Sequence, residues 1–151
     1  MDRTYAYAFV VSAISAIIAS APWIFGFISS TFNPATIGNV GSIKAINIGV
    51  YWDSNCTDEV STIMWGTLEP GSSRNVTVYV RNEGNTAVVL SLNTTNWVPA
   101  NASKYMSLSW DYSGQRVNPK EVIQVTLKLS VSPEISGITT FSFDIVISGN
   151  D

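Results

Sequence analysis

Residues 65–85 read WGTLEPGSSRNVTVYVRNEGN, and this stretch indicates the fold class. Its EPGS segment, with Pro and then Gly at the two central positions, predicts a β-turn. The next segment, Arg74–Asn82, alternates valine with polar or charged residues. A period of two is typical of a strand buried on one face, so Val76, Val78 and Val80 are expected to point into a core. The NEGN segment that follows predicts a hairpin connection, because its glycine can adopt positive φ.

Similar alternation recurs on both sides of this strand, separated by turn residues and without a helical segment. Short strands at such spacing are typical of an all-β sandwich. We therefore predict an all-β sandwich of about seven strands in residues 42–151, preceded by one N-terminal hydrophobic helix. The other expected strands are Ser42–Trp52, Val60–Thr67, Ala87–Asn93, Tyr105–Ser113, Glu121–Val131 and Ile138–Ser148. Expected core residues include Ile46, Ile48, Val50, Trp52 and Trp110.

The N-terminal part of the chain is apolar and carries no charged residue from Thr4 to Ile43. A membrane-spanning helix needs about 20 apolar residues, and Tyr5–Phe32 is long enough. Aromatic residues near both ends of this run fit the interfacial belts of a membrane. We therefore expect an anchor in residues 1–32, a linker in residues 33–41, and a single-pass protein whose C-terminal domain lies outside the membrane.

A cleaved signal peptide is the alternative. Ala6–Ala21 resembles the apolar core of a secretory signal, and Ala19-Ser20-Ala21 resembles a cleavage site. Pro22 would follow the cut, which is a poor position for the peptidase. On this alternative the mature chain is secreted or forms a filament at the cell surface.

Small residues recur every four positions in the apolar segment, at Ala8, Ser12, Ala16 and Ser20. On a helix they form one smooth stripe of the kind that lets two membrane helices approach closely. The alternative is that the stripe only reflects the Ala- and Ser-rich composition of export segments. Self-association by helix pairing is therefore one hypothesis.

The composition argues against several classes of function. The net charge is −3 and the basic residues are scattered, so no nucleic-acid partner is expected. The chain has no histidine, which removes Ser-His-Asp and Cys-His catalysis and the commonest zinc ligand. Cys56 is the one cysteine, so no intrachain disulfide can form. Asp144 has no evident second carboxylate for acid–base hydrolysis, so we expect no enzyme activity and no cofactor.

The segment Trp65–Asn85 resembles the L-x-P-G…V-x-V-x-N-x-G signature of immunoglobulin-like domains on prokaryotic, particularly archaeal, cell surfaces. The layout of the whole chain is similar to that of archaeal membrane-anchored proteins of about this size. The resemblance implies that residues 42–151 form an immunoglobulin-like β-sandwich. The expected partners are the membrane, through the apolar run Tyr5–Phe32, and other envelope proteins. The signature itself encodes a turn and a strand rather than a site.

The order of segments is also similar to that of the TasA/camelysin group of secreted filament subunits and of archaeal bundling pili and threads. In those filaments each subunit exchanges a β-strand with its neighbour. The resemblance implies a donor strand within residues 34–48 and self-association by strand pairing. The departure lies in the leader, which those subunits lose by cleavage, whereas Pro22 disfavours cleavage here.

Four N-glycosylation sequons are present, at Asn55, Asn75, Asn93 and Asn101. Asn75 is expected on the outward face of its strand, and the others at strand ends or in loops. Some sequons arise by chance in a chain rich in Asn, Ser and Thr, but we expect at least one to be used. Glycans would cover exposed sheet edges.

Two further segments are weaker candidates for ligand binding. Asp53–Glu59 places oxygen atoms at alternate positions, as a calcium loop does, but it lacks the turn glycine and the twelfth-position glutamate. We interpret it as a solvated acidic loop. Trp97, expected in a loop beside Pro99, is the candidate for a surface aromatic contact with sugar rings.

The sequence thus predicts a non-enzymatic extracytoplasmic module of the cell envelope with a structural or interaction role. The first alternative is a filament subunit that assembles by donor-strand exchange. The second alternative is a glycan-binding module that uses Trp97.

Overall fold

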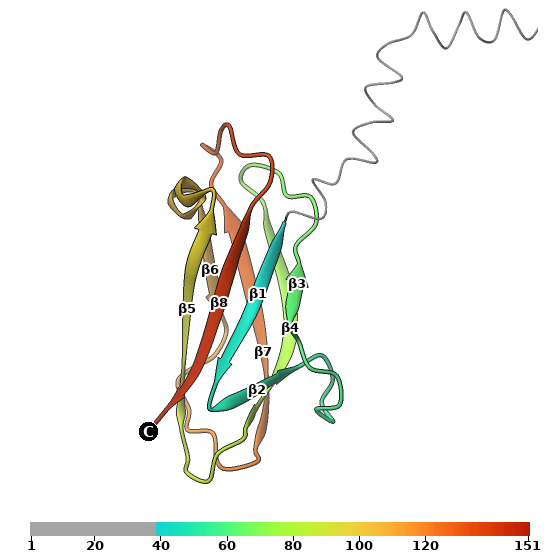
Figure 1. Ribbon diagram of the computed structural model, residues 1–151, viewed down its shortest axis with the longest axis vertical. Helices are drawn as coiled ribbons and strands as arrows, with labels where there is room; N and C mark the ends of the chain where they lie inside the picture. Colours follow the sequence, from blue (N-terminus) through green and yellow to red (C-terminus); the bar gives the residue numbers. More distant parts are fainter. Residues whose placement is uncertain (1–38) are drawn as a thin grey trace, which may run out of the picture. The chain divides into compact units, whose positions relative to one another are not determined.

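The computed structural model describes residues 39–151, which form an all-β domain of two four-stranded sheets (Figure 1). One sheet has the order β3-β1-β8-β5, and the other has the order β2-β4-β7-β6. The strands are β1 (Val40–Ile46), β2 (Ile48–Tyr51), β3 (Thr62–Met64), β4 (Ser73–Asn82), β5 (Val89–Val98), β6 (Met106–Trp110), β7 (Val122–Val131) and β8 (Ser142–Asn150), with the short 3-10 helix η2 (Ala100–Lys104) between β5 and β6. The expected all-β class is confirmed.

The expected anchor in residues 1–32, its stripe at Ala8, Ser12, Ala16 and Ser20, and the first part of the linker lie outside the described residues. Within residues 39–151, no helix has the length and apolar character needed to cross a membrane.

The core consists of apolar side chains from both sheets. The central strand β4 buries Val78 and Val80 as its alternation predicts, and β8 buries Phe143 in the same way. Trp65, which follows β3, is the largest fully buried side chain. The EPGS turn is also confirmed, because Gly71 has a φ of 75° and the Ser72 amide donates to the Glu69 carbonyl over 3.1 Å.

The prediction that Ser42–Trp52 forms one continuous strand is wrong. Asn47 interrupts it with a φ of 62°, a conformation that asparagine tolerates better than most residues. The chain passes at this residue from one sheet to the other, so β1 pairs with β3 and β8 while β2 pairs with β4.

This break changes which side chains are buried. Ile48 and Val50 lie in the core as expected, but Ile46 is 50% exposed because it precedes the break. Trp52 lies beyond the end of β2 and is 39% exposed, so its expected place in the core is wrong. Trp110 is half-buried and packs against the core.

The NEGN segment is not a hairpin turn, because it joins β4 of one sheet to β5 of the other. Asn82 is fully buried at this crossover. Its Nδ2 donates to the carbonyl oxygens of Thr86 and Val117 over 2.7 and 2.9 Å. Its Oδ1 accepts from the Gly84 amide over 2.9 Å. The buried amide therefore holds the connection between the sheets.

The first strand of the domain lies between β3 and β8 and runs parallel to β8. Asn39 fixes its start: Asn39 Nδ2 donates to the Gly66 carbonyl over 2.7 Å, and the Phe141 amide donates to Asn39 Oδ1 over 3.1 Å. Residues 39–41 of the expected linker therefore belong to the folded domain. Because β1 and β8 are parallel, the chain enters the domain at one end and reaches its C-terminus at the other (Figure 1).

Candidate functional site

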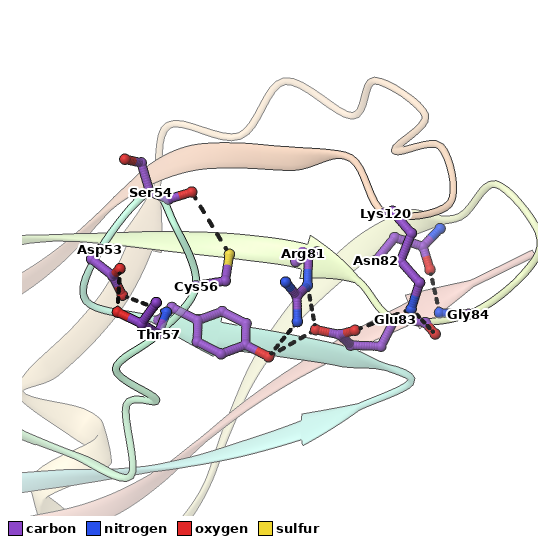
Figure 2. A network of polar contacts seen from close by, with 10 residues as sticks. Asp53, Ser54, Cys56, Thr57, Arg81, Asn82, Glu83, Gly84 and Lys120 are labelled. Atoms are coloured by element: carbon purple, nitrogen blue, oxygen red, sulfur yellow. Dashed lines mark hydrogen bonds and ion pairs between the residues drawn. The ribbon is translucent and has the colours of Figure 1, made fainter.

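The densest polar cluster of the described chain surrounds Glu83, directly after β4 (Figure 2). Tyr51 Oη and Arg81 Nε donate to Glu83 Oε1 over 2.7 and 2.6 Å, and Arg81 Nη2 donates to Tyr51 Oη over 3.2 Å. Lys120 Nζ lies 3.4 Å from Glu83 Oε2. The Arg81 guanidinium also lies over the Tyr51 ring, 5.1 Å from its centroid. These contacts tie the edge strand β2 to β4 and to the loop before β7.

The electrostatics of this cluster favour an ionised carboxylate. Partial burial acts to raise the pKa of Glu83, but hydrogen bonds from Arg81, Tyr51 and Lys120 outweigh it and lower that pKa. The hydrogen bond to Glu83 raises the pKa of Tyr51. A carboxylate that already accepts from three side chains is poorly suited to act as a general acid or base. The cluster is therefore better explained as a set of structural contacts that join β2, β4 and the loop before β7 than as a catalytic centre.

A polar surface hollow of about 520 Å³ adjoins the cluster at the C-terminal end of the domain. It is lined mostly by amide, carboxylate and backbone groups, including Asn47, Asn85, Asn150 and Asp151. Asp151 Oδ1 accepts from the Thr86 hydroxyl over 2.9 Å. The lining offers hydrogen bonds to a ligand, but it does not define one chemical class.

The acidic loop after β2 is closed by its own hydrogen bonds. Asp53 accepts from the amide and hydroxyl of Thr57 over 2.9 and 2.7 Å and from the Asp58 amide over 2.9 Å. The Thr57 hydroxyl and the Asp58 amide lower the pKa of Asp53. In the part of the chain that the structure describes, no group of three His, Cys, Asp or Glu residues is placed to hold a metal ion. Cys56 in this loop is half-buried, and burial raises the pKa of its thiol.

The four sequon asparagines are all exposed, and they are spread over the domain rather than gathered at one place. Asn75 projects from the outer side of β4 as expected, whereas Asn93 lies within β5, which is longer than predicted. The remaining two are in the loop after β2 and in η2: Asn55 and Asn101. Each is exposed, but the four do not form a common site.

Trp97 lies in β5 rather than in a loop, at a register shift between Thr95 and Val98. Its ring stacks on Phe143, with centroids 4.1 Å apart and planes 10° apart. Its Nε1 donates to the Thr94 hydroxyl over 3.2 Å. Because Phe143 covers one face of the indole, this arrangement favours a packing role for Trp97 over a platform for sugars.

Sequence reasoning missed the two polar arrangements that organise the domain, the Glu83 cluster and the buried amide of Asn82. The NEG sequence signals a turn. Of the three side-chain partners of Glu83, Arg81 lies two residues earlier, but Tyr51 and Lys120 come from distant segments of the chain and leave no local pattern. No protein-family model matches the chain, and no curated protein matches it. The function proposed below therefore depends on the sequence and the geometry.

Proposed function

We propose that this chain is a non-enzymatic structural or interaction module of the cell envelope, an immunoglobulin-like sandwich held at the membrane by Tyr5–Phe32. One observation carries the proposal: the uncharged sequence from Thr4 to Ile43 leads without interruption into the first strand of a folded domain. An apolar run of this length is costly to expose to water and favourable in lipid. The folded domain then lies outside the cytoplasm.

The geometry of the domain supports a display role. The chain enters at Asn39, and the parallel pair of β1 and β8 leads to a C-terminus at the opposite end. The polar hollow beside Glu83 lies at the C-terminal end of the domain, away from the point where the chain enters it. The exposure of all four sequon asparagines is also what glycosylation outside the cytoplasm requires.

The experiment that tests this proposal is to express the full chain in an archaeal host, fractionate the membranes and determine the mature N-terminus and mass. We expect an intact N-terminal segment in the membrane fraction, with added glycan mass. A new N-terminus near Pro22, with the protein released into the medium, would contradict the anchor.

A filament subunit is the second candidate, and one observation favours it. Of the seven residues of β1, only Gly41 is buried, although the strand occupies an inner position in its sheet. A strand that fills this position with so little buried side-chain volume could be supplied by a neighbouring subunit. In this structure the chain supplies it itself. Electron microscopy of the secreted material separates the two candidates, because only a filament subunit gives fibres with a uniform repeat.

A further inference from the structure

The strand β5 is the longest edge strand of the described domain. Within its sheet it pairs only with β8 and runs for ten residues, whereas the other edge strands β3, β2 and β6 have three, four and five residues (Figure 1). Its sequence, VLSLNTTNWV, contains no charged residue, no proline and no glycine. A long uncharged edge is a template on which another extended chain can pair, and natural proteins usually shorten, charge or cover such edges.

The backbone groups that face away from β8 alternate along β5. Leu90 shows the direction, because its amide donates to the hydroxyl of Tyr112, which follows β6 of the other sheet, over 3.0 Å. In an antiparallel pair every second residue has the same orientation, so Leu92 and Thr94 also direct their amides and carbonyls to the open side. We call the outward backbone groups of Leu90, Leu92 and Thr94 the β5 edge.

Both ends of β5 are already protected. Before its first residue, Val88 pairs with Val117 through two backbone hydrogen bonds of 3.0 and 2.8 Å. Near its last residue, the register shift between Thr95 and Val98 interrupts regular pairing. The open stretch is therefore the middle of the strand, and Asn93 lies there.

The side chain of Asn93 lies at the β5 edge. Its Oδ1 accepts from the Thr94 amide over 2.8 Å, and that amide faces the open side. This contact is the one hydrogen bond of the Asn93 side chain among the described residues, and Asn93 is exposed. The carboxamide is therefore held beside the open backbone groups, and its Nδ2 has no protein partner within residues 39–151.

We propose that Asn93 carries an N-linked glycan that covers the β5 edge. Asn93-Thr94-Thr95 is a sequon. In the transfer, Asn93 Nδ2 bonds to the anomeric carbon of a lipid-linked oligosaccharide and loses one proton to solvent, while the bond from that carbon to the lipid phosphate breaks and its electron pair leaves with the phosphate. A strand paired to β5 would lie about 4.8 Å away, in the space that the first sugar would occupy. This modification depends on the proposed function, because N-glycosylation takes place outside the cytoplasm.

The other three sequons lie elsewhere on the domain. Asn75 is on the outer face of β4, which is an inner strand of the other sheet. Asn55 and Asn101 are in the loop after β2 and in η2. None of these asparagines is on β5, so loss of a glycan from any of them would leave the β5 edge as it is.

Mass spectrometry of peptides from the full chain, expressed in the same archaeal host, tests the modification site by site. We expect glycan mass on the peptides that contain Asn93. Glycans on other sequons with Asn93 unmodified would overturn this assignment and leave the proposed function standing. A chain that stays in the cytoplasm without any glycan would overturn both.

Matched substitutions at Thr95 separate the glycan from the Asn93 side chain. Thr95→Ala removes the sequon but keeps Asn93 and its contact with Thr94, whereas Thr95→Ser keeps the sequon. In sedimentation velocity of the purified chain in detergent micelles, we expect Thr95→Ala to raise self-association at least about tenfold and Thr95→Ser to match the wild type. Thr77→Ala, which removes the Asn75 sequon, should leave self-association unchanged. Equal self-association of Thr95→Ala and the wild type, or an equal rise in Thr77→Ala, would overturn the role of the glycan at the β5 edge.

Discussion

Gly41 of β1 lies directly against the indole ring of Trp65. A Cβ atom at Gly41 would come within 2.9 Å of Trp65 Nε1 and within 2.7 Å of Ile145 Cδ1. Both partners are fully buried, so neither can move into solvent. Trp65 Nε1 has no hydrogen-bond partner within the described residues. The contact between Gly41 and the indole ring therefore depends on packing and not on a hydrogen bond. The strand fits between β3 and β8 because residue 41 has no side chain.

The first prediction follows from this contact. Gly41→Ala should lower the free energy of unfolding by about 1–3 kcal/mol, because an added methyl group overpacks a closed core. The measurement is urea unfolding of the full chain in detergent micelles, followed by tryptophan fluorescence. Ser42→Ala, the outward neighbour, should change the value by less than about 0.5 kcal/mol. Equal free energies of unfolding for Gly41→Ala and the wild type would show that β1 is not closely packed against Trp65 and Ile145.

The buried amide at the crossover between the sheets gives the second prediction. Asn82→Ala should cost about 2–3 kcal/mol, since it leaves the Thr86 and Val117 carbonyls and the Gly84 amide without their partner. The same unfolding experiment measures the loss. Asn85→Ala, at an exposed position of the same loop, should be nearly neutral. A loss no larger for Asn82 than for Asn85 would contradict the role given to the buried amide.

The Glu83 cluster predicts a pH dependence. Because the folded-state pKa of Glu83 is lowered, its contribution to stability is complete above the unfolded-state pKa and is lost as the pH falls through the folded-state pKa. Stability should therefore decline below about pH 4.5. Glu83→Gln should cost about 1 kcal/mol at pH 7 and should flatten this decline.

This prediction needs a control, because a second carboxylate, that of Asp144, also makes stability decline at acidic pH. Hydrogen bonds from Lys44 and Asn96 lower the pKa of Asp144, so Asp144→Asn should flatten another part of the acid decline. The double variant should flatten it further than either single change. An unaltered pH profile in Glu83→Gln would mean that the cluster does not stabilise the fold.

Trp97 gives a prediction that separates packing from sugar binding. Trp97→Ala should lower the free energy of unfolding by about 2 kcal/mol through loss of the stack on Phe143. Trp97→Phe, which keeps an aromatic ring at this position, should recover much of the loss. Retention of the wild-type chain on polysaccharide columns, abolished in both variants, would favour the glycan-binding alternative instead.

The strand pattern could be predicted from the sequence because one-sided burial leaves a period of two along the chain. Arg74–Asn82 and Glu121–Val131 show this pattern clearly, and both are inner strands of one sheet. The break at Asn47 could not be predicted, because the alternation of isoleucine and valine continues across it. Only the backbone conformation of Asn47 shows that the two halves belong to different sheets.

The polar sites were harder to predict than the strands. Asn82 is one of many asparagines in this chain, and its burial depends on Val117, 35 residues away. Which outward side chains of β3, β1, β8 and β5 lie side by side depends on the pairing of these strands, which only the register specifies. The positions of the sequons could be read directly, because a sequon is a local signal.

The central claim is that the folded domain lies outside the cytoplasm while the chain stays in the membrane. The most direct measurement is labelling of intact cells with a membrane-impermeant maleimide, using a Ser54→Cys variant in the Cys56→Ser background. Position 54 is exposed, so its thiol is open to the reagent. The account predicts label on membrane-pelleted protein before lysis, to the same extent as after lysis. Labelling that requires lysis would contradict it.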